Sequence, residues 1–179
     1  MLSKDDSLVL IIDIQEKLVA ALNKQTIVQN SSKVAKAASI LEIPVLLTEQ
    51  YPQGLGSTIQ PLKDVLSADS QIVEKTYFNA LLEDGMLDKI KSYNKKQIVL
   101  MGIETHICVY QTALALIEEG FDVYVVKDAC ASRNKYEFKM GIEAMKDSGA
   151  KISCVEMILF EWLKGAKHPC FKEVQKLIK

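Results

Sequence analysis

The sequence predicts an α/β protein: a single-domain, doubly wound three-layer sandwich in which helices flank a mostly parallel sheet of about six strands. One observation is that short apolar runs alternate with longer segments of helical periodicity, which is the pattern of βαβ units. Another is that these runs are nearly continuous in hydrophobicity, as in strands that are covered on both faces. A third is the length, because 179 residues bury a sizeable core by themselves, so we expect residues 1–179 to form one domain.

The elements of this fold can be assigned in order along the chain. The strands are expected at Leu8–Ile12, Val45–Leu47, Ile98–Met101 and Val123–Val126, with weaker candidates at Gln71–Glu74 and Lys151–Val155. The helices are expected at Ile27–Leu41, Leu81–Lys91, Ile107–Glu118 and Tyr136–Ser148, with a short amphipathic helix at Phe171–Lys179. Gly120 and Gly149 stand where glycine commonly ends a helix. The segment Gln50–Pro61 is rich in Gly and Pro and predicts a surface loop.

Composition and charge give no support to several classes of partner. The 22 basic and 23 acidic residues leave a formal net charge of −1 without a basic block, so there is no electrostatic reason to expect nucleic-acid binding. No apolar stretch approaches the ~20 residues of a membrane span. The first residues, MLSKDDSLVLIID, do not resemble a signal peptide, because the apolar run is short and bounded by aspartates. We therefore expect a cytoplasmic protein with no membrane partner.

The four cysteines form no CxxC pair and no histidine cluster accompanies them, so a structural zinc site or a disulfide framework is not expected. Cys130, Cys154 and Cys170 are interpreted as structural thiols. The two histidines are His106 and His168. We expect neither a metal nor another cofactor.

Ligands of open α/β sheets bind beyond the carboxyl ends of the strands, so residues that follow strands are the candidates for a site. Asp13 follows the first strand, Lys75 the third, and Cys108 lies in the first turn of the helix after the fourth. Taken singly, Asp13 is a good helix N-cap, Lys75 a common surface residue, and Cys108 equally well a buried structural cysteine. Taken together, Lys75 could stabilise a Cys108 thiolate while Asp13 accepts and returns its proton.

The segment GIETHICVYQTALALIEEG (102–120), with Asp13 at the end of the first strand and Lys75 in EKTYF, resembles the isochorismatase-like cysteine hydrolases. The resemblance runs through the whole chain. It is strongest to the isochorismatase domain-containing proteins, whose sequences look like TEQYPQGLGST (48–58), DACASR (128–133) and HPCFKEVQKLIK (168–179).

The resemblance implies a catalytic triad of Asp13, Lys75 and Cys108. It also implies a cis peptide bond between Ile103 and Glu104, which turns the Glu104 N–H toward the Cys108 N–H to form an oxyanion hole. Metal-containing nicotinamidases carry histidines after the second strand, whereas this chain has none before His106, which argues against a metal site and against nicotinamidase activity. Isochorismatases proper lack the nucleophilic cysteine, so Cys108 also argues against vinyl-ether cleavage. The family usually forms dimers or larger homo-oligomers.

Other residues near these positions carry two interpretations each. Gln50 and Tyr51, at the rim of the expected pocket, either contact substrate or fold their loop. Phe78 either forms a wall of the pocket or is a core aromatic residue. The Glu104 side chain faces either the pocket or solvent. His106 lies two residues from Cys108 on a different helix face, so packing or an interface contact is favoured over a Cys–His dyad.

The leading hypothesis is a hydrolase that cleaves a carbonyl C–N bond of a small amide, imide or carbamoyl compound through a covalent Cys108 intermediate. The alternative is a non-catalytic binding or scaffold member of the same family. A nuclease has no support in metal ligands or in charge.

Overall fold

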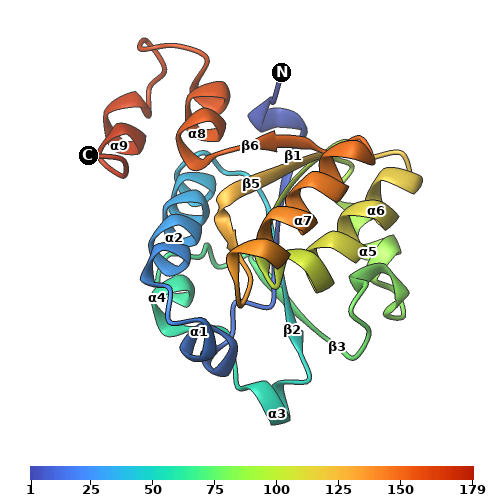
Figure 1. The fold of residues 1–179 in the computed structure, drawn as a ribbon. Coiled ribbons are helices and arrows are strands. Elements are labelled where there is room, and N and C mark those ends of the chain that lie inside the picture. The colour runs from blue at the N-terminus through green and yellow to red at the C-terminus, as the bar shows by residue number, and fades with distance from the viewer.

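The computed structural model describes residues 1–179 and contains one sheet of six parallel strands, flanked by helices (Figure 1). The strand order is β3-β2-β1-β4-β5-β6, so the sheet is wound in both directions from β1. This confirms the predicted doubly wound α/β fold. The strands are β1 (Ser7–Ile12), β2 (Val45–Gln50), β3 (Gln71–Lys75), β4 (Gln97–Ile103), β5 (Asp122–Ala131) and β6 (Lys151–Ser153).

Helices cover both faces of the sheet. Figure 1 shows α2 on one side of the strands and α5, α6 and α7 on the other; α8 packs with α2 against β5, and α6 against the opposite face of that strand. The helices are α1 (Glu16–Leu22), α2 (Gln25–Ile40), α3 (Pro52–Leu55), α4 (Gln60–Lys63), α5 (Met86–Ser92), α6 (Tyr110–Glu118), α7 (Lys135–Asp147), α8 (Val155–Leu163) and α9 (Phe171–Gln175). None of them is long and apolar enough to cross a membrane.

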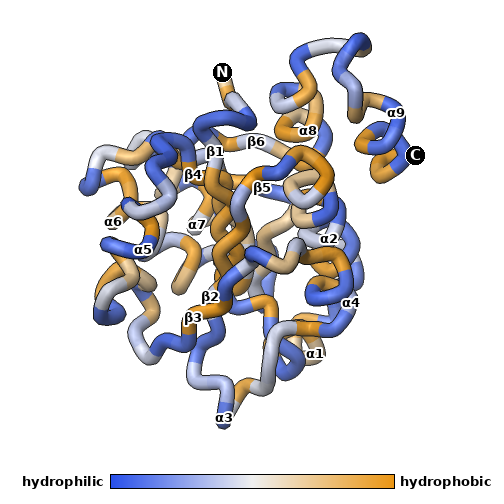
Figure 2. The backbone as a smooth tube through the Cα atoms, turned by 180° about the vertical axis from the view of Figure 1, so that it is seen from behind, coloured by the Kyte–Doolittle hydropathy of each residue, from blue (hydrophilic) through white to orange (hydrophobic).

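The central strands are buried over their full length. Every residue of β1 and of β4 is buried, and Figure 2 shows the strands as the hydrophobic centre of the molecule. This is why their sequences are continuous apolar runs instead of alternating ones: both faces pack against helices, and each face requires apolar side chains. The edge strand β3 is more exposed, which explains its weaker signal in the sequence.

Several element boundaries differ from the prediction. Strand β5 continues past Val126 to Ala131, because a register shift opposite Leu100 and Gly102 lets the chain pair again with β4 after an exposed polar interruption. The expected helix 81–91 is a 3-10 turn at Ala80–Leu82 followed by α5, with a break at Gly85, whose φ is +75°. The weak strand candidate 151–155 ends at Ser153, and Val155 already begins α8. Helices α1 and α8 had not been predicted, and the segment Gln50–Pro61 contains α3 and the start of α4 in addition to loop.

The topology determines where a site can form. Strands β1 and β4 are neighbours, but the connections that leave β1 and β4 run to opposite sides of the sheet. Such a switch point leaves a crevice beyond the carboxyl ends of the two strands. Asp13 directly follows β1, and the turn that carries Cys108 directly follows β4.

Candidate active site

Asp13, Lys75 and Cys108 meet at this crevice although they are far apart in the sequence. The Lys75 Nζ lies 2.7 Å from the Asp13 Oδ2, and both side chains are buried. Asp13 and Cys108 line the same cavity. Lys75 is only 2% exposed, so it is not the surface residue that its position alone favoured. The structure therefore brings the three predicted residues into one electrostatic unit.

Two neighbouring groups fix the Asp13 carboxylate. The Thr48 Oγ1 at the end of β2 donates a 2.7 Å hydrogen bond to the Asp13 Oδ1, and Lys75 occupies the other carboxylate oxygen. The backbone of Asp13 has a φ of +52°, a conformation that aspartate and asparagine tolerate better than most residues. The chain thus leaves β1 through a sharp turn, and the hydrogen bonds from β2 and β3 determine the direction of the carboxylate.

Lys75 has no ammonium N–H left for another partner. Its Nζ donates to the Asp13 Oδ2, to the Gln50 Oε1 at 2.6 Å and to the Tyr77 carbonyl oxygen at 3.1 Å. An ammonium group has three donors, so these contacts use all of them. Gln50, predicted as a substrate contact, therefore also holds Lys75 in place.

The Cys108 thiol is protonated at neutral pH in this environment. Burial, followed by the negative charge of Asp13, raises the pKa of the thiol from its ordinary 9.0 to about 12, although the positive charge of Lys75 lowers it. Lys75 lowers the thiol pKa, as expected, but burial and Asp13 together raise it by more. A reaction at Cys108 therefore needs a base that takes the thiol proton, and the Asp13 carboxylate lines the same cavity as the thiol.

The turn after β4 carries the nucleophile. The peptide bond between Ile103 and Glu104 is cis, as the resemblance implied, and a π-helical turn (Thr105–Val109) follows it and leads into α6. The Glu104 backbone lowers the pKa of the Cys108 thiol, and Glu104 and Cys108 line the same cavity. Just before the turn, Gly102 has a φ of +142°, and an added Cβ would lie 2.1 Å from a carbonyl oxygen of β1.

The Glu104 side chain points away from the nucleophile. Its Oε2 accepts hydrogen bonds from the Arg133 backbone N–H at 3.0 Å and from the Arg133 Nε at 3.1 Å. His106 also leans toward this segment, with its Nδ1 3.0 Å from the Ser132 Oγ and its Nε2 3.6 Å from a Glu137 oxygen. His106 thus has packing partners on the loop before α7 and on α7 itself, consistent with the packing role favoured from the sequence.

The cavity at Cys108 is small and mostly apolar. Its volume is about 110 Å³. Gln50 and Phe78 line it, whereas Tyr51 does not and is 57% exposed. The remaining lining residues besides Asp13 and Cys108 are Leu18, Leu55, Ile103, Glu104 and Ile107.

Three residues of the candidate active site are not among the predicted site residues. Thr48 ends a strand beside Asp13 in the register of the sheet, so strand-end position was the available signal for it. Leu18 and Leu55 reach the cavity from α1 and α3, and no pattern in the sequence marks them as lining residues.

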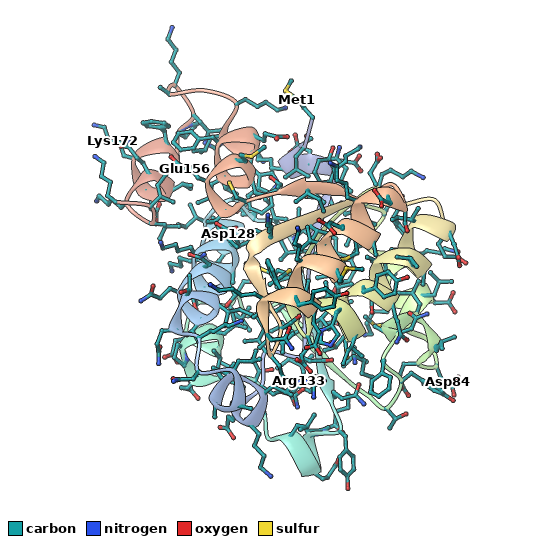
Figure 3. All side chains as sticks on the ribbon, viewed as in Figure 1. Met1, Asp84, Asp128, Arg133, Glu156 and Lys172 are labelled. Carbon is teal, nitrogen blue, oxygen red and sulfur yellow. The ribbon has the colours of Figure 1, made fainter.

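A larger cavity lies at the other end of the molecule and does not belong to this site. It has a volume of about 630 Å³ and is lined by the first three residues and by α8 with the residue that follows it. Figure 3 shows Met1 and Arg133 at opposite ends of the molecule. This cavity faces the amino ends of the strands and contains no nucleophile, so the smaller cavity at Cys108 is the candidate active site.

The remaining cysteines are free thiols outside the site. Burial raises the pKa of Cys130 to about 12, and no charged partner of the kind found at Cys108 compensates for it. No group of three or more His, Cys, Asp or Glu side chains in the structure could hold a metal ion.

Comparison with known proteins places this geometry in a family. The model of the isochorismatase domain matches residues 7–157. The isochorismatase domain-containing protein 2 of Xenopus laevis is 38% identical over 99% of this chain and 85% of its own length. A structure of MAR1 ribonuclease from Caenorhabditis elegans is similar with a TM-score of 0.93 and 36% identity, covering 99% of this chain and 91% of that one. The Escherichia coli YcaC gene product, described as an octameric hydrolase of unknown specificity, has a TM-score of 0.88 and 25% identity, covering 99% and 94%. This chain belongs to the isochorismatase family.

Proposed function

We propose that this protein is a cysteine hydrolase that cleaves a carbonyl C–N bond of a small amide, imide or carbamoyl compound. The observation that carries the proposal is the buried Lys75–Asp13 pair, whose Asp13 lines one cavity together with the thiol of Cys108. A buried charge pair is costly to maintain without a use for it, and here it provides a base beside a protonated nucleophile.

The geometry supports a reaction in two halves. The Cys108 Sγ attacks the carbonyl carbon while the thiol proton moves to the Asp13 carboxylate, and the carbonyl electrons move onto the oxygen. The Glu104 and Cys108 backbone N–H groups stabilise this oxyanion. The oxyanion collapses to a thioester as the C–N bond breaks, and Asp13 returns the proton to the leaving nitrogen. Water then attacks the thioester with Asp13 as base, which releases the acid and restores the thiol.

Lys75 has an orienting role in this scheme. Its three hydrogen bonds hold the Asp13 carboxylate toward the cavity and keep a positive charge near the negative charge that develops on the sulfur. We further propose a homo-oligomeric assembly, which the octameric Escherichia coli relative supports, and a cytoplasmic location.

The test is a screen of small amides and carbamoyl compounds, read by ammonia release, on the wild type, Cys108→Ala and Cys170→Ala in parallel. We expect activity in the wild type and in Cys170→Ala, a matched control whose thiol lies outside the site, and none in Cys108→Ala. The acyl-enzyme is sought by mass spectrometry of quenched reactions. Turnover by Cys108→Ala would contradict the mechanism. A wild-type protein that turns over nothing would favour the non-catalytic binding role. Incubation with RNA, read by gel electrophoresis of the fragments, tests the activity named for the Caenorhabditis elegans relative.

A further inference from the structure

The charges around the cavity, and not only its size, restrict what can enter. Asp13 and Glu104 line it, and no lysine, arginine or histidine does. The nearby cation, Lys75, has its three donors committed to Asp13, Gln50 and the Tyr77 carbonyl. Arg133 is engaged with the Glu104 carboxylate. A carboxylate on the substrate would find no positive partner and would face the negative charge of Asp13.

The polar groups that remain match one functional group. The Gln50 amide is partly engaged, because its Nε2 donates one N–H to the Thr76 carbonyl and its Oε1 accepts from Lys75, which leaves one N–H donor and no charge for a ligand. The Glu104 and Cys108 backbone N–H groups can donate to a carbonyl oxygen, and the Asp13 carboxylate can face the leaving nitrogen. These contacts suffice for one amide group and provide no positive charge for a carboxylate.

The rest of the wall is hydrocarbon. It consists of side chains from three helical elements, one strand end and one loop: Leu18, Leu55, Phe78, Ile103 and Ile107. An apolar cavity of about 150 Å³ accommodates one benzene molecule. The cavity here, at about 110 Å³, is smaller, so it suits a short aliphatic chain better than an aromatic ring.

From these contacts we infer that the site selects small, uncharged, aliphatic amides and rejects substrates whose acyl group carries a carboxylate. The inference rests on the proposed function, since it names the substrate class of the same cavity. Burying an unpaired carboxylate is expensive, so the discrimination between a neutral and an anionic substrate of equal size is on the order of 100-fold or more in kcat/KM.

Selection by charge can be measured without turnover. Iodoacetamide and iodoacetate have nearly the same size and both alkylate thiols, but only iodoacetate is an anion. The rates at Cys108 are read by mass spectrometry of its peptide, and the same two rates at free mercaptoethanol serve as reference. We expect the preference for iodoacetamide at Cys108 to exceed the preference at mercaptoethanol by at least about tenfold.

A designed cation provides the matched test. In Leu18→Lys, an ammonium group at the cavity wall should lower the iodoacetamide preference at Cys108 by about tenfold, whereas Leu18→Met should retain it. Hydrolysis of butyramide and malonamate, a neutral and an anionic compound of similar length with one amide group each, is compared on the same three proteins, with butyramide preferred by the wild type. A wild-type preference within about threefold of mercaptoethanol, or equal turnover of the two compounds, would overturn the inference and leave the hydrolase proposal intact. Strong charge selection in labelling without hydrolysis of any amide would sustain the inference as a binding preference and remove the hydrolase proposal.

Discussion

The Asp13 carboxylate is proposed to act on Cys108 in two ways: it raises the thiol pKa, and it accepts the thiol proton. Replacing Asp13 by asparagine separates these two effects. Asparagine keeps the size of the side chain and tolerates the φ of +52°, so the backbone turn after β1 should remain. The negative charge of Asp13 is one of the causes that raise the thiol pKa to about 12, and Lys75 opposes it. Without that charge the thiol pKa should fall below the wild-type value, although the base that accepts the thiol proton is lost.

The lower thiol pKa favours reaction, whereas the loss of the base opposes it. With a pKa of about 12, only about one thiol in 10⁵ is ionised at pH 7, so the wild type depends on Asp13 as base. Loss of general-base catalysis should lower kcat by about 10²- to 10⁴-fold, even though more thiolate is present. The thiolate is titrated by its ultraviolet absorbance as the difference from a Cys108→Ala protein, and kcat is measured on the amide found in the screen.

Stability provides the control for this variant. Asp13→Asn leaves the buried Lys75 ammonium without its carboxylate, at an expected cost of about 3–5 kcal/mol in urea unfolding. Adding Lys75→Met removes the unpaired charge, so the double variant should regain part of the unfolding free energy and none of the activity. Turnover within tenfold of wild type in Asp13→Asn, or a thiol pKa that does not fall, would refute the assignment of Asp13 as base.

Three further predictions follow from the same geometry. Gly102→Ala places a methyl group 2.1 Å from the Ile12 carbonyl oxygen, so the variant should fail to fold or lose more than about 4 kcal/mol in urea unfolding, and a wild-type midpoint would contradict this contact. Thr48→Val removes the 2.7 Å hydrogen bond to the Asp13 carboxylate and should cost about 1.5–3 kcal/mol in the same assay, with an unchanged stability counting against the bond. Because a raised pKa keeps the Cys108 thiol protonated below its value of about 12, kcat/KM should show no thiol ionisation between about pH 7 and pH 9; an increase of about tenfold per pH unit would show that a preformed thiolate reacts.

The sequence was most informative where the local residue pattern of an element and its packing in the tertiary structure require the same side chains. Strands β1 and β4 are buried on both faces, so their apolar runs marked the sheet and its parallel character, and the strand ends then indicated Asp13 and Lys75. Where the two requirements differ, prediction was weaker. Strand β5 crosses a polar interruption at Asp128, which is held by hydrogen bonds from Asn30 and Val155 before the chain pairs with β4 again. Helix α1 has only seven residues, so its stability comes from packing more than from its own periodicity.

For the site, the sequence alone determined which residue types stand at the carboxyl ends of the strands, because strand periodicity and the order of elements are local properties of the chain. Only the tertiary structure decided how those residues are connected. It committed all three Lys75 donors, left the Cys108 thiol protonated beside Asp13, and placed Gln50 on the cavity while Tyr51 faces outward. Hydrogen-bond partners, burial and electrostatic shifts depend on groups brought together from different strands, and no local pattern of residues contains that information.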